Sequence, residues 1–176
     1  MIFTETKLKG AFIIEQEPRI DHRGFFSRTF CAQEFEKHGL ESNMVQSNLS
    51  YSKEKYTLRG MHFQTNGHEE VKLVRCTKGK ILDTIVDLRP ESATYCESIS
   101  VELTPENFRM LYVPRGFAHG FLTLEEDSEI FYQVSAFYSQ ENERGVRWND
   151  PAFNIDWPVK NPILSEKDKN HADYIK

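Results

Sequence analysis

The stretch VKLVRCTKGKILDTIVDL, residues 71–88, carries the clearest fold signal in the chain. Two runs rich in β-branched and aliphatic residues, 71–76 and 81–88, flank the tetrapeptide Thr77-Lys78-Gly79-Lys80. Short runs of this composition are typical of strands, and a short connection that contains glycine is typical of a tight antiparallel turn. The stretch therefore predicts two strands joined as an antiparallel pair.

Similar runs recur along the rest of the chain. Further strands are expected at residues 11–14, 25–30, 44–49, 57–63, 98–103, 109–113, 120–124 and 129–137. Turn residues separate them, as in Arg89-Pro90-Glu91-Ser92. Only residues 32–38 and the segment that begins at Ser165 have a helical pattern, and Ser165 can cap the second of these. The pattern predicts an all-β sandwich or barrel with a few short helices.

Composition indicates a soluble globular protein. The 176 residues, 39% of them hydrophobic and 28% charged, suit one domain spanning residues 1–176 with a core that needs no disulfides. No apolar run approaches the roughly 20 residues of a membrane helix, and no secretory signal is visible, so we expect a cytoplasmic protein. A net charge of −5 argues against a nucleic-acid surface and leaves room for a small anionic ligand.

The three cysteines do not form a recognisable motif. Cys31, Cys76 and Cys96 are odd in number and far apart, which matches neither a disulfide framework nor a CxxC site. We expect them to be reduced thiols, buried as free cysteine usually is.

Polar side chains accumulate on particular strand faces. Residues two apart share a face, so Gln46 projects with Asn48 and His62 projects with Gln64. Lys72 begins another strand in the same way. One polar pair is most simply a solvated face of an antiparallel sheet, but several together favour a polar pocket.

Tyr132 stands on an otherwise apolar face, between Ile130 and Val134. A buried tyrosine hydroxyl usually has a partner or a function. His119 lies among aromatic and small residues in PRGFAHGF, residues 114–121, where a histidine that is merely hydrogen-bonded is the simpler interpretation.

Arg59 and His62 point to opposite faces under strict alternation. A pocket that uses both side chains needs a bulge or a twist between them. Gly60 is suited to that irregularity.

Eight segments, taken in order, cover almost the whole chain: DHRGFF (21–26), QSN (46–48), LRGMHFQ (58–64), KLVR (72–75), VDLR (86–89), PRGFAHGF (114–121), RGVRWNDP (144–151) and ILSEKD (163–168). Together they resemble the dTDP-4-dehydrorhamnose 3,5-epimerases, the RmlC-type cupins. The resemblance implies a cupin-type β-jelly roll (double-stranded β-helix), an isomerase without cofactor or metal, and a nucleotide-sugar substrate. It also implies a homodimer with shared active sites and exchanged N-terminal strands.

Carried over position by position, the resemblance implies three catalytic roles. His62 is the general base, Asp168 orients it, and Tyr132 is the general acid. A hexose with a keto group at carbon 4 has mildly acidic hydrogens on carbons 3 and 5, because loss of either gives an enolate. A His–Asp pair is a suitable base for this step near neutral pH.

The resemblance also assigns residues to the substrate. Lys72 and Arg59 resemble cations that face the developing oxyanion, where fixed charge contributes strongly to catalysis. Gln46, Asn48 and His119 resemble substrate contacts. Arg23 resembles the residue that binds the diphosphate, and in this family it serves the site of the partner subunit.

One position departs from the family pattern. Arg28 stands where the family commonly has Glu, which changes the charge beside the expected nucleotide region. The nucleoside, and whether carbon 3, carbon 5 or both are epimerised, stay open.

Three alternatives compete with this interpretation. Metal-dependent cupins place a second His two residues after the first, and Gln64 occupies that position. A non-catalytic sugar-nucleotide-binding cupin would have no use for His62, Asp168 and Tyr132 together. A 3,4-ketoisomerase would use the same enolate, and the sequence does not separate it from an epimerase.

Overall fold

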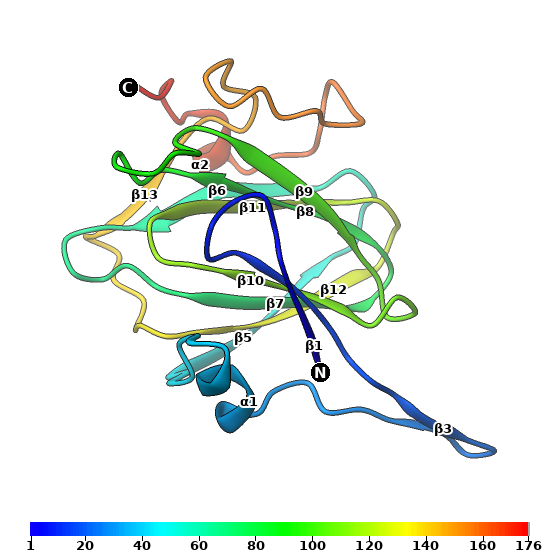
Figure 1. Ribbon diagram of the computed structural model, residues 1–176. Coiled ribbons are helices and arrows are strands. Elements are labelled where there is room, and N and C mark those ends of the chain that lie inside the picture. The colour runs from blue at the N-terminus through cyan, green and yellow to red at the C-terminus, as the bar shows by residue number, and fades with distance from the viewer. Residues whose placement is uncertain (176) are drawn as a thin grey trace.

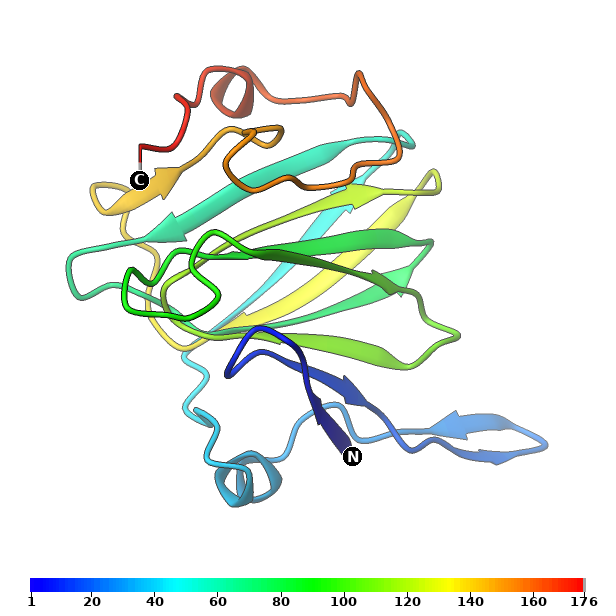
Figure 2. The same ribbon diagram turned by 45° about the horizontal axis from the view of Figure 1, so that its top comes forward.

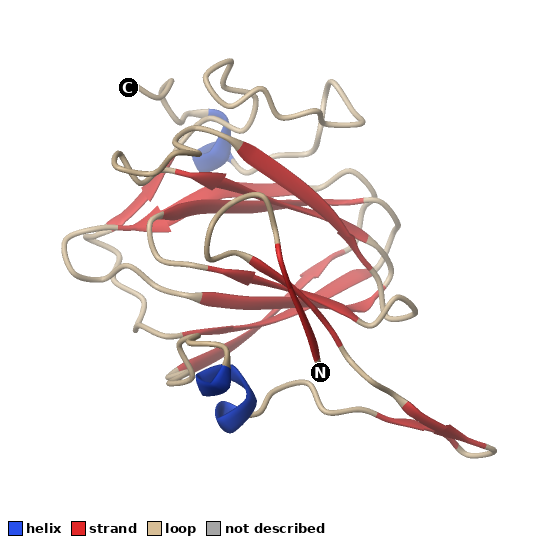
Figure 3. Cartoon of the chain, in the orientation of Figure 1, coloured by secondary structure: helices blue, strands red, loops and turns tan. Residues whose placement is uncertain are grey.

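Two antiparallel sheets face each other in the computed structural model, which describes residues 1–175 (Figures 1 and 3). Lys176, the last residue of the predicted domain, lies outside the described residues. The larger sheet has the order β1 (Ile2–Glu5), β2 (Phe12–Glu15), β10 (Arg109–Val113), β7 (Lys72–Lys78), β12 (Ser128–Val134) and β5 (Gln46–Ser52). The smaller has the order β13 (Glu143–Gly145), β6 (Leu58–Gln64), β11 (Phe117–Thr123), β8 (Ile81–Asp87) and β9 (Ser98–Leu103). The expected all-β jelly roll is confirmed.

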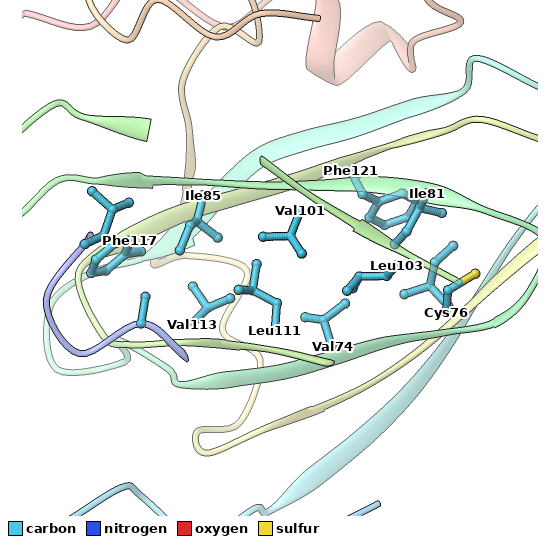
Figure 4. Close-up of a cluster of buried hydrophobic side chains, with 13 residues drawn as sticks. Val74, Cys76, Ile81, Ile85, Val101, Leu103, Leu111, Val113, Phe117 and Phe121 are labelled. Carbon is cyan, nitrogen blue, oxygen red and sulfur yellow. The ribbon is translucent and has the colours of Figure 1, made fainter. Parts of the chain in front are cut away.

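The core lies between the two sheets. Val74, Leu111 and Val113 project from the larger sheet toward Ile85 and Val101 of the smaller one (Figure 4). β7, β9 and β10 each contribute two residues that are two apart in the sequence, as the period of two requires. The core therefore depends on face-to-face packing of the sheets.

The expected pairing of the two strands in residues 71–88 is wrong. β7 pairs with β10 and β12, whereas β8 pairs with β11 and β9. Both runs are apolar because both of their faces are buried: Val74 and Ile85 lie in the core between the sheets, whereas Leu73 and Val86 lie in two further buried clusters. The Lys78–Ile81 connection leads from one sheet to the other. Composition alone does not distinguish packing across sheets from pairing along an edge.

Most of the other expected strands are confirmed. Residues 98–103 and 109–113 match β9 and β10, and further strands shift by one to three residues at an end. The expected strand at 25–30 is wrong beyond β4 (Gly24–Phe26), and β1, β3 (Arg19–Asp21) and β13 were not predicted. These are strands of three or four residues, which form through pairing with a neighbour more than through their own composition.

Both expected helical segments are confirmed. α1 spans Ala32–Lys37, and α2 spans Glu166–Lys169. The Ser165 hydroxyl accepts a hydrogen bond from the Asp168 amide at 3.1 Å, so the predicted cap fixes the first turn of α2. No helix in residues 1–175 is long and apolar enough to cross a membrane. Cys76 and Cys96 are buried, Cys31 is partly buried, and all three are unpaired.

The β3–β4 hairpin projects away from the sandwich (Figure 2). Ile20 and Phe26 on it are 74% and 67% exposed. Large apolar side chains gathered on a projecting element mark an interaction surface more often than a free one.

A buried carboxylate organises the loop after β8. Asp87 accepts hydrogen bonds from the Arg89 guanidinium at 2.8 Å, from the Ser92 hydroxyl at 2.6 Å and from the Thr94 hydroxyl at 2.8 Å. Burial alone would raise the pKa of Asp87, but these donors outweigh it and hold the pKa at about 2, below the usual 3.8. The ionised carboxylate therefore stabilises the folded state.

We predict that Asp87→Asn lowers the free energy of unfolding by about 2 kcal/mol at neutral pH. The pKa of Asp87 is lower in the folded state than in the unfolded state. This contribution is therefore fully present at pH values above the unfolded-state pKa, and it is lost as the pH falls from about 5 toward 2. Urea unfolding at several pH values measures the deficit. The exposed Asp156→Asn is the matched control. A deficit that does not shrink in acid would contradict the prediction.

Candidate active site

Two adjoining cavities of about 460 and 330 Å³ lie within the sandwich and share His62, Lys72 and Tyr132 as lining residues. The first is also lined by Arg59, His119 and Asp168, and the second by Gln46 and Asn48. Eight of the nine site residues expected from the sequence thus line these two adjoining cavities. The polar strand faces point into the cavities.

His62 and Asp168 form a hydrogen-bonded pair. His62 Nε2 lies 2.6 Å from Asp168 Oδ1, and the Asp168 side chain is only 5% exposed. Burial opposes ionisation, but the hydrogen bond and charge of His62, together with hydrogen bonds from the Ser165 hydroxyl and the Gly60 backbone, outweigh it, so the pKa of Asp168 is below its usual range. An ionised carboxylate only accepts hydrogen bonds, so Nε2 of His62 carries the proton. Nδ1 is then the ring atom able to accept another.

A bulge in β6 brings Arg59 into the same cavity as His62. His119 on β11 is opposite His62, and Phe121 is opposite Arg59, so two steps on β11 match three on β6. Gly60 within this bulge has φ +131°. The prediction of an irregularity at Gly60 is confirmed, and it explains how residues three apart reach one cavity.

Lys72 carries its charge beside a buried acid. Its ammonium pairs with Glu70, and the Lys72 and Glu70 side chains are 12% and 8% exposed. The Gln64 amide donates to the same Glu70 carboxylate. Gln64 is therefore held by an acid, in the position where a metal-dependent cupin would have a histidine.

Tyr132 lies between buried Ile130 and Val134 and packs against the core, as expected. Its ring lines both cavities. Burial, and then the negative charge of Glu70, raise the pKa of the Tyr132 hydroxyl. The hydroxyl is thus protonated at neutral pH and able to donate.

His119 also belongs to a His–Asp pair. Its Nε2 lies 2.7 Å from Asp83 Oδ1, and Asp83 is fully buried. The simpler interpretation of His119 as a hydrogen-bonded histidine is therefore confirmed, and the residue also lines the first cavity. Asp83 was not singled out from the sequence, although a carboxylate inside the apolar run 81–88 was a usable signal.

Two further residues were missed. Glu143 lines the second cavity, accepts a hydrogen bond from the Tyr138 hydroxyl at 2.9 Å and pairs with Lys167 at 2.5 Å. His171 lies beside the His62–Asp168 pair, with Nε2 3.7 Å from Asp168 Oδ1. No periodic pattern marks either residue, because their positions depend on the short strand β13 and on the fold of the C-terminal segment.

Arg23 is not near the cavities of its own chain. It lies at the tip of the β3–β4 hairpin, 79% exposed, and pairs with Asp21 at 2.6 Å. Arg28 pairs with Glu34 at 3.1 Å, so its charge is matched within the chain. Neither residue lines the two cavities.

Known proteins share both the sequence and the fold. The family model described as dTDP-4-dehydrorhamnose 3,5-epimerase matches residues 5–175. The chain belongs to this family. A relative of that name from Shigella flexneri is 41% identical over 172 residues, 97% of this chain and 94% of its own length.

Solved structures of the family extend the comparison. The Bacillus anthracis epimerase, with TDP and PPi bound, is 40% identical, with a TM-score of 0.95 over 98% of this chain and 99% of its own. The Legionella pneumophila enzyme, in complex with dTDP-4-keto-L-rhamnose, is 35% identical, with a TM-score of 0.91 over 97% and 90%. The family's cupin-type jelly roll is therefore the fold of this chain.

We predict that Gly60→Ala destabilises the protein by at least about 3 kcal/mol. A Cβ there would lie 2.5 Å from Gly120 Cα and 2.9 Å from the His119 carbonyl oxygen, both backbone atoms that cannot give way. Gly67→Ala is the matched control: its φ is also positive, at +82°, but no atom lies within 4 Å of the new Cβ. The control should lose about 1 kcal/mol. Equal losses in urea unfolding would show that close packing at Gly60 is unimportant.

Proposed function

We propose that this chain epimerises a nucleoside-diphosphate 4-keto-6-deoxy-hexose at carbon 3, carbon 5 or both. Inversion at both carbons converts dTDP-4-dehydro-6-deoxy-D-glucose to dTDP-4-dehydro-L-rhamnose. The observation that carries the proposal is the His62–Asp168 pair in one cavity wall with the protonated Tyr132 in the same cavity. The names of the relatives and the dTDP-4-keto-L-rhamnose in the Legionella complex support the substrate.

His62 is the proposed general base. Nδ1 takes a proton from the carbon next to the keto group and leaves the electron pair of the C–H bond in the enolate, while the Nε2 proton stays hydrogen-bonded to Asp168. The imidazolium that forms is stabilised by the ionised Asp168. Asp168 thus lowers the barrier to proton removal in two ways, by orienting the His62 ring and by stabilising its positive charge.

The enolate oxygen needs positive charge around it, and Arg59 and Lys72 supply it from the cavity wall. Inversion then requires a proton from the opposite face of the sugar ring. The proposed donor is Tyr132, whose hydroxyl keeps its proton at neutral pH. Gln46, Asn48 and His119 are proposed substrate contacts in the same cavities.

Catalysis in this proposal uses side chains alone, without cofactor or metal. The binding of Gln64 to Glu70 supports this, because an amide held by a carboxylate is not available as a metal-binding histidine equivalent.

The proposed assembly is a homodimer with shared active sites. Its support is the projecting hairpin, whose Ile20 and Phe26 are exposed while Arg23 at its tip lies away from the cavities. A second chain would cover the apolar residues and receive Arg23 beside the substrate diphosphate. Cytoplasmic residence belongs to the same proposal and is supported by the unpaired thiols.

The base and acid roles can be separated in heavy water with dTDP-4-keto-6-deoxyglucose. We predict that His62→Asn abolishes both deuterium uptake and epimer formation, a loss of at least about a hundredfold, because the enolate no longer forms. Tyr132→Phe should still take up deuterium while configuration is retained at one carbon or more. Mass spectrometry and NMR measure both outcomes.

Normal epimer yield at the wild-type rate in Tyr132→Phe would mean that another group is the acid. Deuterium uptake by His62→Asn would remove His62 as the base. Migration of the carbonyl to carbon 3 would identify a ketoisomerase, and binding without exchange in the wild type would identify a binding protein.

Shared sites predict complementation between two impaired variants, assayed at a substrate concentration below the raised KM. Arg23→Ala should raise KM strongly while the protein still folds. In a hybrid dimer with His62→Asn, one site would lack both groups and the other would have both. Mixing the two proteins should therefore restore part of the activity, measured with the same epimerisation assay. If hybrids form and no activity returns, Arg23 acts in the site of its own chain.

A further inference from the structure

A second histidine completes a cluster at the base. His62, Asp168 and His171 each offer one nitrogen or oxygen atom, and these three atoms lie within 4.8 Å of one another. The His171 side chain is 15% exposed, and its Nε2 is buried without a hydrogen-bond partner among residues 1–175. A buried ring nitrogen without a partner is costly, so its position beside a carboxylate needs an explanation.

The space for His171 comes from a glycine. Gly145 on β13 is opposite His62 on β6 in the strand register. A Cβ at Gly145 would overlap the His171 ring. The His171 ring therefore occupies the place that a side chain at residue 145 would take, directly beside the His62–Asp168 pair.

We propose that the His62–Asp168–His171 cluster binds a divalent transition metal of the Zn²⁺ class and that the bound ion inhibits the base. Two imidazole nitrogens and one carboxylate oxygen are a ligand set that zinc prefers, with water completing the coordination. His171 has no alternative hydrogen bond to break on binding within the described chain. The ion takes the place of the proton between His62 and Asp168.

Inhibition follows from the proton on His62, and this part rests on the proposed function. In the free pair the ring proton is on Nε2, and Nδ1 accepts the substrate proton. A metal on Nε2 leaves neutral imidazole with its one proton on Nδ1. No proton is gained or lost, but no nitrogen of the ring remains free to act as a base. The metal-free enzyme is the active form.

Zinc competition against a colorimetric chelator tests the site without any activity measurement. We expect wild-type protein to bind one Zn²⁺ per chain, and His171→Gln to bind it at least about tenfold more weakly because one ligand is lost. Gly145→Ala, which displaces the ring and keeps all three ligands, should weaken binding in the same direction. His68→Gln, which removes a histidine outside the cluster, is the control and should bind as the wild type does.

Epimerisation is then measured with each variant relative to its own metal-free rate. Zn²⁺ should inhibit the wild type and His68→Gln, EDTA should restore the rate, and His171→Gln should need at least about tenfold more Zn²⁺ for the same inhibition. Equal zinc affinity of His171→Gln and the wild type would overturn the site, and His171-dependent binding without inhibition would overturn the inhibition. Absence of epimerisation in the metal-free wild type would refute the proposed function alone, because the chelator competition decides the site independently.

Discussion

The hydrogen bond between His62 and Asp168 joins parts of the chain that are 106 residues apart. A buried carboxylate costs several kcal/mol unless it is partnered, and His62 is the strongest of the partners of Asp168, which also include Ser165 and the Gly60 backbone. The same contact closes the first cavity, since residues 163–168 form one of its walls. Backbone hydrogen bonds of Ile163 to Tyr56 and Leu58, at 2.8 and 2.9 Å, hold the start of that wall against β6. The orientation of the His62 ring and the closure of the first cavity therefore both depend on the packing of the segment from Ile163 to Asp168 against β6.

Charge in the cavity walls is mostly paired. Lys72 meets Glu70, Lys167 meets Glu143, and His119 meets Asp83. Arg59 differs, because its hydrogen bonds go to neutral oxygens, the Ser52 hydroxyl and the Tyr51 carbonyl. A cation that no carboxylate neutralises exerts the stronger field in a cavity of low dielectric. Within residues 1–175, Arg59 therefore contributes more unbalanced positive charge to the first cavity than Lys72 does.

Long strands made much of this site predictable from the sequence. Alternation along β6 and β12 placed His62 with Gln64 and isolated Tyr132 on an apolar face, and the Ser165 cap located α2. Asp168 was expected only from the resemblance to the family. Glu143 and His171 were not predictable in this way, because a three-residue strand exists only through its pairing with β6. The sequence also favoured the wrong partner for β7, since two apolar faces look the same whether strands pair or pack. Local pattern shows which residues are buried, but tertiary contacts determine what they meet.

The strand order has a consequence for how this chain reaches its native state. β2 pairs with β10, β5 with β12 and β6 with β13, so each pairing closes a loop of roughly 80 to 100 residues. Loop-closure entropy must be overcome before these pairings add stability, and folds of this kind assemble in milliseconds to seconds. Until β12 has paired with it, β5 has no neighbouring strand in the larger sheet. The exposed Leu49 and Tyr51 on β5 add to the apolar surface. The period of greatest vulnerability to aggregation is therefore the interval before the distant strands meet.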